Sequence, residues 1–376
     1  MSELQQPKIK HRWFLKRQLL ILLLPLAGFL SYWGKAHPEW VEHHYSTTIY
    51  HGLSQAVSAL TGLVPFSMAE VCIAALILFA VWMLIRMIRG LRDKEQRNAD
   101  VLNRFFSTAA AIASTICLLF VLNCGLNYSR YSFTAYSGLT VRNSSAQELA
   151  ALCAELIEEV NELRPLMTED ENGVMILTAS SYDTASKTKE AFDTLSEQYA
   201  VLQGSYAQPK PVFFSRLMSY TQITGFFFPY TFEANVNIEA PDHTIQATMC
   251  HELAHLRGFM REDEANFIGY LACMASNDPE LRYSGAMLAL LHSMNSLYGA
   301  DYDTFCALNA LYDPGVSRDF TYNNWYWQQF EGTVAEVSDK INDTYLKVNH
   351  QTDGVKSYGR MVDLLLADYR ARHGLE

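Results

Sequence analysis

The sequence has no Cys-x-x-Cys pair, although it contains seven cysteines. Zinc sites made of thiolates use such pairs, so we do not expect a cysteine cluster to bind metal here. Repeats, low-complexity runs and long linkers are also missing. We expect Cys250 and Cys273, which lie in apolar stretches, to be small core residues, while disulfide pairing stays open. Because 376 residues exceed what one core usually covers, we predict two structural regions.

Charge is missing from three long stretches among the first 130 residues. They cover 18–34, 71–85 and 105–129, and the second needs 65–70 to reach full length. Since about 20 apolar residues cross a bilayer, we predict three transmembrane helices at about 18–34, 66–86 and 105–126. No cleavage site of small residues follows the first stretch, so a removed signal peptide is not expected. The prediction is a membrane region over 1–129 and a second domain over 130–376.

Positive charge is nearly absent from one side of these predicted helices. Of the 12 Lys and Arg residues up to residue 125, five precede the first helix and six lie between the second and third. Only Lys35 lies between the first and second. Cytoplasmic loops are enriched in Lys and Arg. We therefore predict a multi-pass plasma-membrane protein with a cytoplasmic N-terminus, an extracytoplasmic C-terminal domain and the lipid bilayer as a partner.

The C-terminal region lacks the basic surface that nucleic acids need. Residues 126–376 carry 17 basic and 33 acidic side chains, a net charge of −16. This balance argues against nucleic acid as a partner. A channel or transporter is also not favoured, because Glu70 is the only acidic residue near a predicted span.

The residues after 130 predict an α+β domain that is mostly helical. Ser145 and Glu148 form a capping box that opens a helix ending at Pro165. Aromatic and β-branched residues between 210 and 241 indicate two or three short strands. Asp242 is expected to cap the next helix, and Gly258 to end it. Helices are expected at 180–203, 243–257, 263–276, 280–298, 318–347 and from about 357.

The helix after the strands carries the motif His251-Glu252-x-x-His255. Histidines four residues apart project from one helix face and can bind one metal ion, while the glutamate can reach water. The motif also occurs by chance. Here it lies in the middle of a helix, follows a short strand region and precedes a carboxylate-rich segment. We therefore predict a Zn²⁺ site bound by His251 and His255, with Glu252 as the general base.

Catalytic zinc needs a third protein ligand. Position 261 is arginine, which excludes the third histidine of the metzincin pattern. The carboxylates at 262, 263 and 264 remain as candidates, and they also suit a helix N-terminus. Hydrolysis also needs a donor to the oxyanion. Tyr230, Tyr358 and Arg360 are candidates, although each also suits a structural role.

The segment REDEANFIGY resembles the E-x-x-A-[DN] stretch of gluzincin-type metallopeptidases. It is most similar to the E-x-E-A-N-x-F-A stretch of regulatory metallopeptidases that cleave repressor proteins. The resemblance implies Glu262 as the zinc ligand, with Glu264 as the alternative, and Asn266 as the residue that orients a ligand. Only six residues separate His255 from Glu262, fewer than in most gluzincins. Gly258 must therefore turn the chain sharply.

Over most of its length the chain resembles a bacterial membrane-protein family, domain of unknown function 3810. The resemblance is carried by GLNYSRY, KPVFFSRLMSYTQITGFFFP, EANVN, HELAHLRGFMREDEANFIGYLAC and NDTYLKVNHQTDGVKSYGRMVDLLL. It implies a zincin-like membrane protein and supplies no substrate. We expect a zinc endopeptidase that hydrolyses proteins or peptides outside the cytoplasm. The alternative is a non-catalytic membrane sensor or scaffold with a zincin fold.

Overall fold

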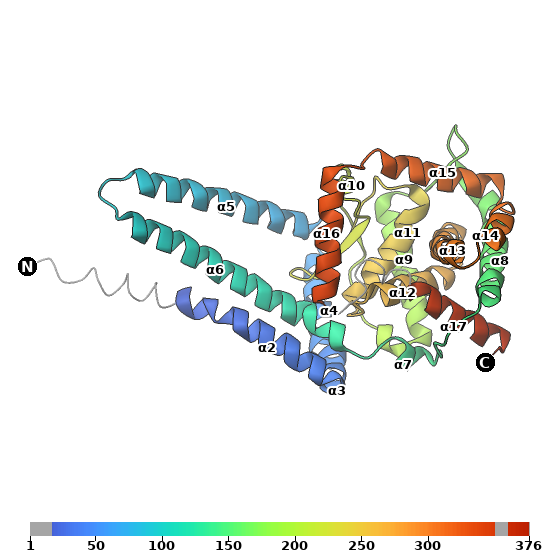
Figure 1. The fold of residues 1–376 in the computed structure, drawn as a ribbon, viewed down its shortest axis with the longest axis horizontal. Coiled ribbons are helices and arrows are strands. Elements are labelled where there is room, and N and C mark those ends of the chain that lie inside the picture. The colour runs from blue at the N-terminus through green and yellow to red at the C-terminus, as the bar shows by residue number, and fades with distance from the viewer. Residues whose placement is uncertain (1–16, 350–359, 376) are drawn as a thin grey trace, which may run out of the picture.

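Three apolar helices near the N-terminus project together from one side of a helical domain (Figure 1). The computed structural model describes residues 17–349 and 360–375. The first apolar helix covers Arg17–Ala36, of which Leu23–Ala36 is labelled α2; the others are α5 (Met68–Arg92) and α6 (Asn98–Asn123). Each is long enough to cross the hydrocarbon region. The three apolar helices predicted from the sequence are confirmed as candidate membrane spans.

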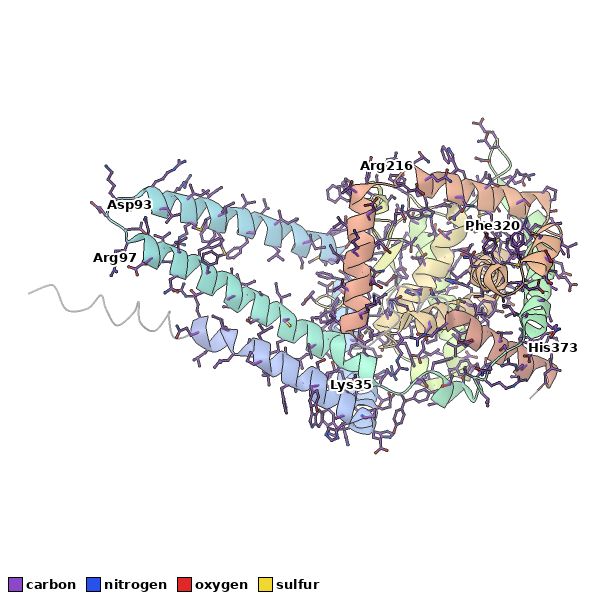
Figure 2. The ribbon with its side chains drawn as sticks, viewed as in Figure 1. Lys35, Asp93, Arg97, Arg216, Phe320 and His373 are labelled. Carbon is purple, nitrogen blue, oxygen red and sulfur yellow. The ribbon has the colours of Figure 1, made fainter. Side chains whose placement is uncertain are left out.

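The basic residues of the connection between α5 and α6 lie at the end of these helices that is far from the domain. Figure 2 shows Asp93 and Arg97, in the connection between α5 and α6, at that end. The start of the first apolar helix lies on the same side (Figure 1). Lys35, by contrast, lies beside the domain (Figure 2). The charge asymmetry of the sequence therefore follows the long axis of the molecule.

The chain between the first two apolar helices is itself helical and packs on the domain. It forms α3 (Pro38–Trp40), the π-helix η1 (Val41–Tyr50) and α4 (His51–Thr61). Glu42 is fully buried and accepts hydrogen bonds from Arg130, with Nη2 to Oε1 at 2.8 Å and Nε to Oε2 at 3.1 Å. The Tyr50 hydroxyl donates to the carbonyls of His255 and Leu256. This connection therefore contributes side chains to the core of the C-terminal domain.

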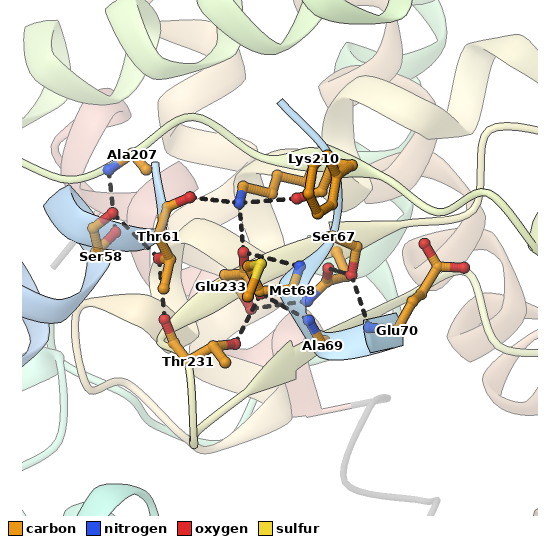
Figure 3. Close-up of polar contacts among 12 residues, drawn as sticks. Ser58, Thr61, Ser67, Met68, Ala69, Glu70, Ala207, Lys210, Thr231 and Glu233 are labelled. Atoms are coloured by element: carbon orange, nitrogen blue, oxygen red, sulfur yellow. Dashed lines mark hydrogen bonds and ion pairs between the residues drawn. The ribbon is translucent and has the colours of Figure 1, made fainter. Parts of the chain in front are cut away.

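A buried polar cluster joins the domain end of α5 to the neighbouring sheet (Figure 3). Lys210 and Glu233 form a buried ion pair, and the Lys210 ammonium also donates to the carbonyl of Thr61 at 2.7 Å. The Glu233 carboxylate accepts from the backbone N–H of Ala69 at 2.9 Å and of Met68 at 3.2 Å. Negative charge at a helix N-terminus is stabilised by the free N–H groups and the helix dipole. The cluster therefore fixes α5 to the sheet.

The sheet beside the metal-motif helix has three short strands. They are β3 (Lys210–Pro211), β4 (Gly225–Phe228) and β5 (Glu233–Val236), in the order β3-β5-β4. β4 pairs antiparallel with β5, with Gly225 opposite Val236, and β3 pairs parallel with β5. β4 is therefore an edge strand, and the strand region expected before the motif is confirmed. A separate hairpin joins β1 (Thr168–Glu169) and β2 (Met175–Ile176).

The helix that carries the motif, α11 (Asp242–Leu256), lies at the centre of the domain (Figure 1). It packs against α9 (Ser181–Gln198), α12 (Glu262–Met274), α13 (Pro279–Ala300), β4 and β5. Its inner side buries Met249 and Leu253 completely. The remaining elements are η2 (Gly125–Ser129), α7 (Thr134–Ser137), α8 (Ala146–Leu163), η3 (Arg164–Leu166), η4 (Ala200–Leu202), α10 (Ser215–Ser219), α14 (Tyr302–Asn309), α15 (Pro314–Gln328), α16 (Thr333–Val348) and α17 (Met361–His373).

Local sequence signals predicted some boundaries correctly and others wrongly. The capping box of Ser145 and Glu148 is present, and Gly258 adopts φ +88° after α11. Asp242 does not cap α11; it is the first helical residue, and its carboxylate accepts from the backbone N–H of Leu177 at 2.7 Å. The single helix expected over 318–347 is two helices, α15 and α16, because Gly332 interrupts the chain at φ +146°. The start expected near 357 lies outside the described residues.

Candidate metal centre

His251 and His255 project from adjacent turns of α11, with their ring centroids 4.5 Å apart. The left-handed conformation of Gly258 turns the chain back, and α12 begins four residues later at Glu262. α12 approaches α11 closely at Gly269, where a Cβ would lie 3.1 Å from the backbone nitrogen of His251. The two helices therefore form a tight hairpin that brings the start of α12 to the histidines.

Glu262 is the carboxylate that this hairpin brings to the two imidazoles. Its Oε2 lies 3.2 Å from Nε2 of His251 and 3.6 Å from Nε2 of His255. One ligand atom from each of the three residues lies within 4.8 Å of the others. In a tetrahedral zinc site with bonds of about 2.0–2.1 Å, neighbouring ligand atoms are about 3.3 Å apart. The donor set and the two distances from the carboxylate to the imidazoles therefore fit Zn²⁺.

The other nitrogen of each imidazole has a partner that fixes the ring. Nδ1 of His251 lies 2.7 Å from Oδ1 of Asn266, and Nδ1 of His255 lies 2.8 Å from the carbonyl of Phe259. With oxygen acceptors at Nδ1, that nitrogen carries a proton, and Nε2 is the atom that faces Glu262 and that could bind a metal once it has lost its own proton. Hydrogen bonds of this kind are typical of metal-binding histidines.

The charges of Glu262 and His255 act on each other strongly because both groups are buried, whereas His251 is partly exposed. Burial alone would raise the pKa of Glu262, but the two histidines outweigh it and hold the pKa well below its usual range. Burial would lower the pKa of His255, whereas the Glu262 carboxylate raises it to about 9. Without a cation, the ionised carboxylate is thus balanced by a proton on the imidazoles, and a metal ion would bind by displacing that proton.

Glu252 lies in the same cavity as the three candidate ligands. Only 3% of its surface is exposed, and its Oε2 has no hydrogen-bond partner among the described residues. Burial raises the pKa of its carboxyl group to about 7. It lines a cavity of about 810 Å³ together with His251, His255 and Glu262, and we call this space the metal cavity. Burying a carboxylate without a partner lowers the stability of the fold. Carboxyl groups with such a raised pKa in a cavity are typical of functional sites.

The neighbouring acidic residues point elsewhere. Oε1 of Glu264 accepts from the backbone N–H of Phe133 and from Nη1 of Arg261, both at 3.0 Å. Asp263 lies 3.7 Å from Nε of Arg360. Glu262 is therefore the one of the three carboxylates that lies with the histidines.

Comparison with known sequences assigns this architecture to a family. Residues 45–366 match the family described as protein of unknown function (DUF3810). The chain belongs to this family. No curated protein and no solved structure matches the chain.

The three candidate oxyanion donors of the DUF3810 chain have different surroundings. Tyr230 lines the metal cavity, but its hydroxyl donates to the carbonyl of Ile116 in α6 at 3.2 Å. Arg360 is paired with Asp263 and is not among the cavity-lining residues of the described chain. Tyr358 lies outside the described residues.

Sequence reasoning missed cavity residues that come from distant elements. Tyr128 follows α6, His292 is on α13 and Tyr345 is on α16, and all three line the metal cavity. The hydroxyls of Tyr128 and Tyr345 lie 3.1 Å apart. Burial raises the pKa of both phenols, and the charge of Glu262 raises them further. Both phenols thus stay protonated and can donate hydrogen bonds. Tyr128 and Tyr345 lie in GLNYSRY and NDTYLKVNH, two stretches that carry the family resemblance, but nothing in the spacing of these stretches places them beside residues 251–262.

Proposed function

We propose that this protein is a membrane-anchored, zinc-dependent metallopeptidase of the zincin type. The proposal rests on one observation: His251, His255 and Glu262 lie together, and Glu252 is buried beside them in the same cavity. One oxygen of Glu252 has no hydrogen-bond partner among the described residues. Metallopeptidases use this combination of two histidines, a carboxylate ligand and a separate glutamate. The proposed substrates are proteins or peptides.

The residues of the chain have distinct roles in this proposal. Zinc held by His251, His255 and Glu262 would supply a Lewis acid for amide hydrolysis. Glu252 takes a proton from the attacking water and gives it to the leaving amine, as the C–O bond forms and the C–N bond breaks. Asn266 fixes the ring of His251. The edge strand β4, whose first residue Gly225 lies against Glu252, offers backbone groups to an extended peptide.

The proposed location is a plasma membrane, with the metal site on the extracytoplasmic side. The basic residues of 86–104 and the start of the first apolar helix lie together at the end away from the domain (Figures 1 and 2). Under the positive-inside rule, that end is cytoplasmic. The domain end of the helices, with one lysine at position 35, is then outside.

A non-catalytic sensor or scaffold is the alternative, and one feature argues against it. Structural zinc sites are closed by four protein ligands. In the described part of the chain, the group that could hold a metal has three members, and it faces a cavity. Space for water and substrate beside three ligands is the arrangement of a catalytic site.

Metal content tests the site directly. The full-length protein, purified in detergent, is analysed for zinc alongside Glu262→Ala and Glu264→Ala, two neighbouring buried glutamates. We expect about one zinc per wild-type chain, loss of zinc in Glu262→Ala, and retention in Glu264→Ala. Wild-type protein without stoichiometric zinc would refute the proposal.

Activity is then measured on reconstituted protein with fluorescently labelled casein. Glu252→Gln removes the base but keeps the shape of the side chain. We expect it to retain zinc and to lose cleavage by roughly 10²-fold or more. Equal cleavage by wild type and Glu252→Gln would contradict the assigned role and favour a contaminating protease.

A further inference from the structure

α16 carries an apolar stripe that the described part of the chain leaves uncovered. Val334, Val337, Ile341 and Val348 follow one another at helical spacing, and they are 56%, 49%, 65% and 70% exposed. The adjoining side of the helix carries the charged residues Glu336, Lys340 and Lys347. An apolar stripe of this kind normally packs against another surface, and an exposed one marks an interaction site.

The stripe lies next to the domain end of α6. Tyr345, at the edge of the stripe, packs on Phe120 of α6 with ring centroids 5.9 Å apart. α6 has 26 residues and is about 39 Å long, whereas the hydrocarbon core is about 30 Å thick. Phe120, in the last turn of α6, is therefore at the boundary of the hydrocarbon, and the stripe begins at the same level.

The other end of α16 is connected to α5 through α10. Phe330, just before α16, packs on Tyr220 with centroids 5.0 Å apart. At the start of α10, the backbone N–H groups of Phe213 and Phe214 each donate to the carboxylate of Glu70 at 3.0 Å. Glu70 is in the first turn of α5. The exposed rings of Phe213 and Phe214 therefore lie beside the outer end of a second span.

α10 and α16 thus bridge the domain ends of two apolar helices. Figure 1 shows α16 running crosswise to α5 and α6, between them and the rest of the domain. A helix in this position is parallel to the plane of a membrane crossed by α5 and α6. Its inner side contributes Asp339, Asn342 and Tyr345 to the metal cavity. One helix therefore separates the cavity from the region that the bilayer would occupy.

We propose that α16 is an interfacial helix whose stripe of Val334, Val337, Ile341 and Val348 lies in the surface of the lipid bilayer, with Phe213 and Phe214 beside it. Amphipathic helices bury their apolar face by several ångströms at the boundary of headgroups and acyl chains. The domain has a net charge of −16 over 126–376, so the contact is apolar and does not depend on anionic lipid. The metal cavity then opens at the membrane surface, on the other side of this helix.

Photo-crosslinking in lipid nanodiscs tests this contact on the full-length chain. The photoreactive residue p-benzoylphenylalanine replaces Ile341, and mass spectrometry identifies the adducts after illumination in phosphatidylcholine nanodiscs. Matched positions are Lys340, the preceding residue on the charged side of α16, and Leu311, which is 58% exposed and follows α14 in the chain. α14 lies on the side of the domain away from the apolar helices (Figure 1). Phe79, in the middle of α5, serves as the position that must react with lipid.

We expect lipid adducts at 341 approaching the yield at 79, and at least tenfold less at 340 and 311. Repeating the experiment at 0.5 M salt should leave the yield at 341 unchanged. Adducts at 79 without adducts at 341 would overturn the proposal. So would a crosslink from 341 to protein, because it would place a second copy or another part of this chain on the stripe. The test involves no metal or substrate, so its outcome is independent of the proposed peptidase activity.

Discussion

Gly225, the first residue of β4, lies directly against the carboxylate of Glu252. A Cβ at position 225 would be 2.6 Å from Oε1 of Glu252 and 2.7 Å from Cγ2 of Thr248. Its backbone φ is not in the left-handed region, so conformational freedom is not the reason for glycine here. The reason is close approach: the edge strand and the proposed base share one small space.

Gly225→Ala should therefore displace Glu252 and lower peptidase activity by roughly 10²-fold, because a general base must keep hydrogen-bonding distance to its proton. Zinc content should not change, since none of the three proposed ligands is touched. The control is Gly299→Ala on α13, where a Cβ would meet no atom within 4 Å. Paired zinc analysis and casein cleavage check this; unchanged activity in Gly225→Ala would mean that catalysis does not depend on the present position of the Glu252 carboxylate beside β4.

Asn266 should control metal affinity without binding the metal. Its Oδ1 is 2.7 Å from Nδ1 of His251, and loss of such a partner typically weakens metal binding by 10–100-fold. We expect this loss in Asn266→Ala and recovery in Asn266→Asp, which keeps an acceptor oxygen. Competition with a zinc chelator measures the affinity. If Asn266→Asp bound zinc as poorly as Asn266→Ala, packing and not the hydrogen bond would be responsible.

Glu42→Ala should destabilise the C-terminal domain, although Glu42 precedes the second apolar helix. The substitution leaves the guanidinium of Arg130 buried without its carboxylate, which costs about 3–5 kcal/mol. Arg130 also donates to the carbonyl of Arg257, at the end of α11. Unfolding in detergent measures the loss of stability. Lys347→Gln, which removes the exposed member of the ion pair with Asp343, is the control and should cost less than about 1 kcal/mol.

Stability should fall in mild acid because of His243 on α11. Burial lowers the pKa of this imidazole from 6.5 to about 4, while the charge of Asp319 partly opposes the shift. Between these values the unfolded chain binds a proton that the folded chain does not, so the unfolding free energy decreases as the pH falls from about 6.5 toward 4. The decrease from this group is at most about 3 kcal/mol. His243→Gln should reduce the slope of unfolding free energy against pH; parallel curves would contradict this.

The apolar spans and the metal motif could be predicted because their signals are local. Length without charge identified the three helices, and H-E-x-x-H needs only one helix to bring His251 and His255 together. Glu262 was implied by resemblance, and the left-handed Gly258 explains how so short a connection brings it to the histidines.

The rest of the site could not be predicted because it depends on contacts between distant residues. Tyr128, His292 and Tyr345 meet in the cavity only after α6, α13 and α16 have packed. Nothing local in residues 37–61, the connection between the first two apolar helices, predicts that their side chains enter the core of the C-terminal domain. Asp242 had the pattern of a helix cap, but the N–H of Leu177 provides a tertiary partner that local rules do not include.

The Lys210–Glu233 cluster has a consequence for biosynthesis. Glu233 binds the N–H groups of Met68 and Ala69, which are synthesised more than 160 residues earlier. The first turn of α5 therefore emerges from the ribosome long before its partners exist. Until 210–233 have been translated, these N–H groups lack the carboxylate that they bind in the folded protein. If the proposed membrane anchoring is correct, insertion of α5 comes first, and completion of the sheet follows it.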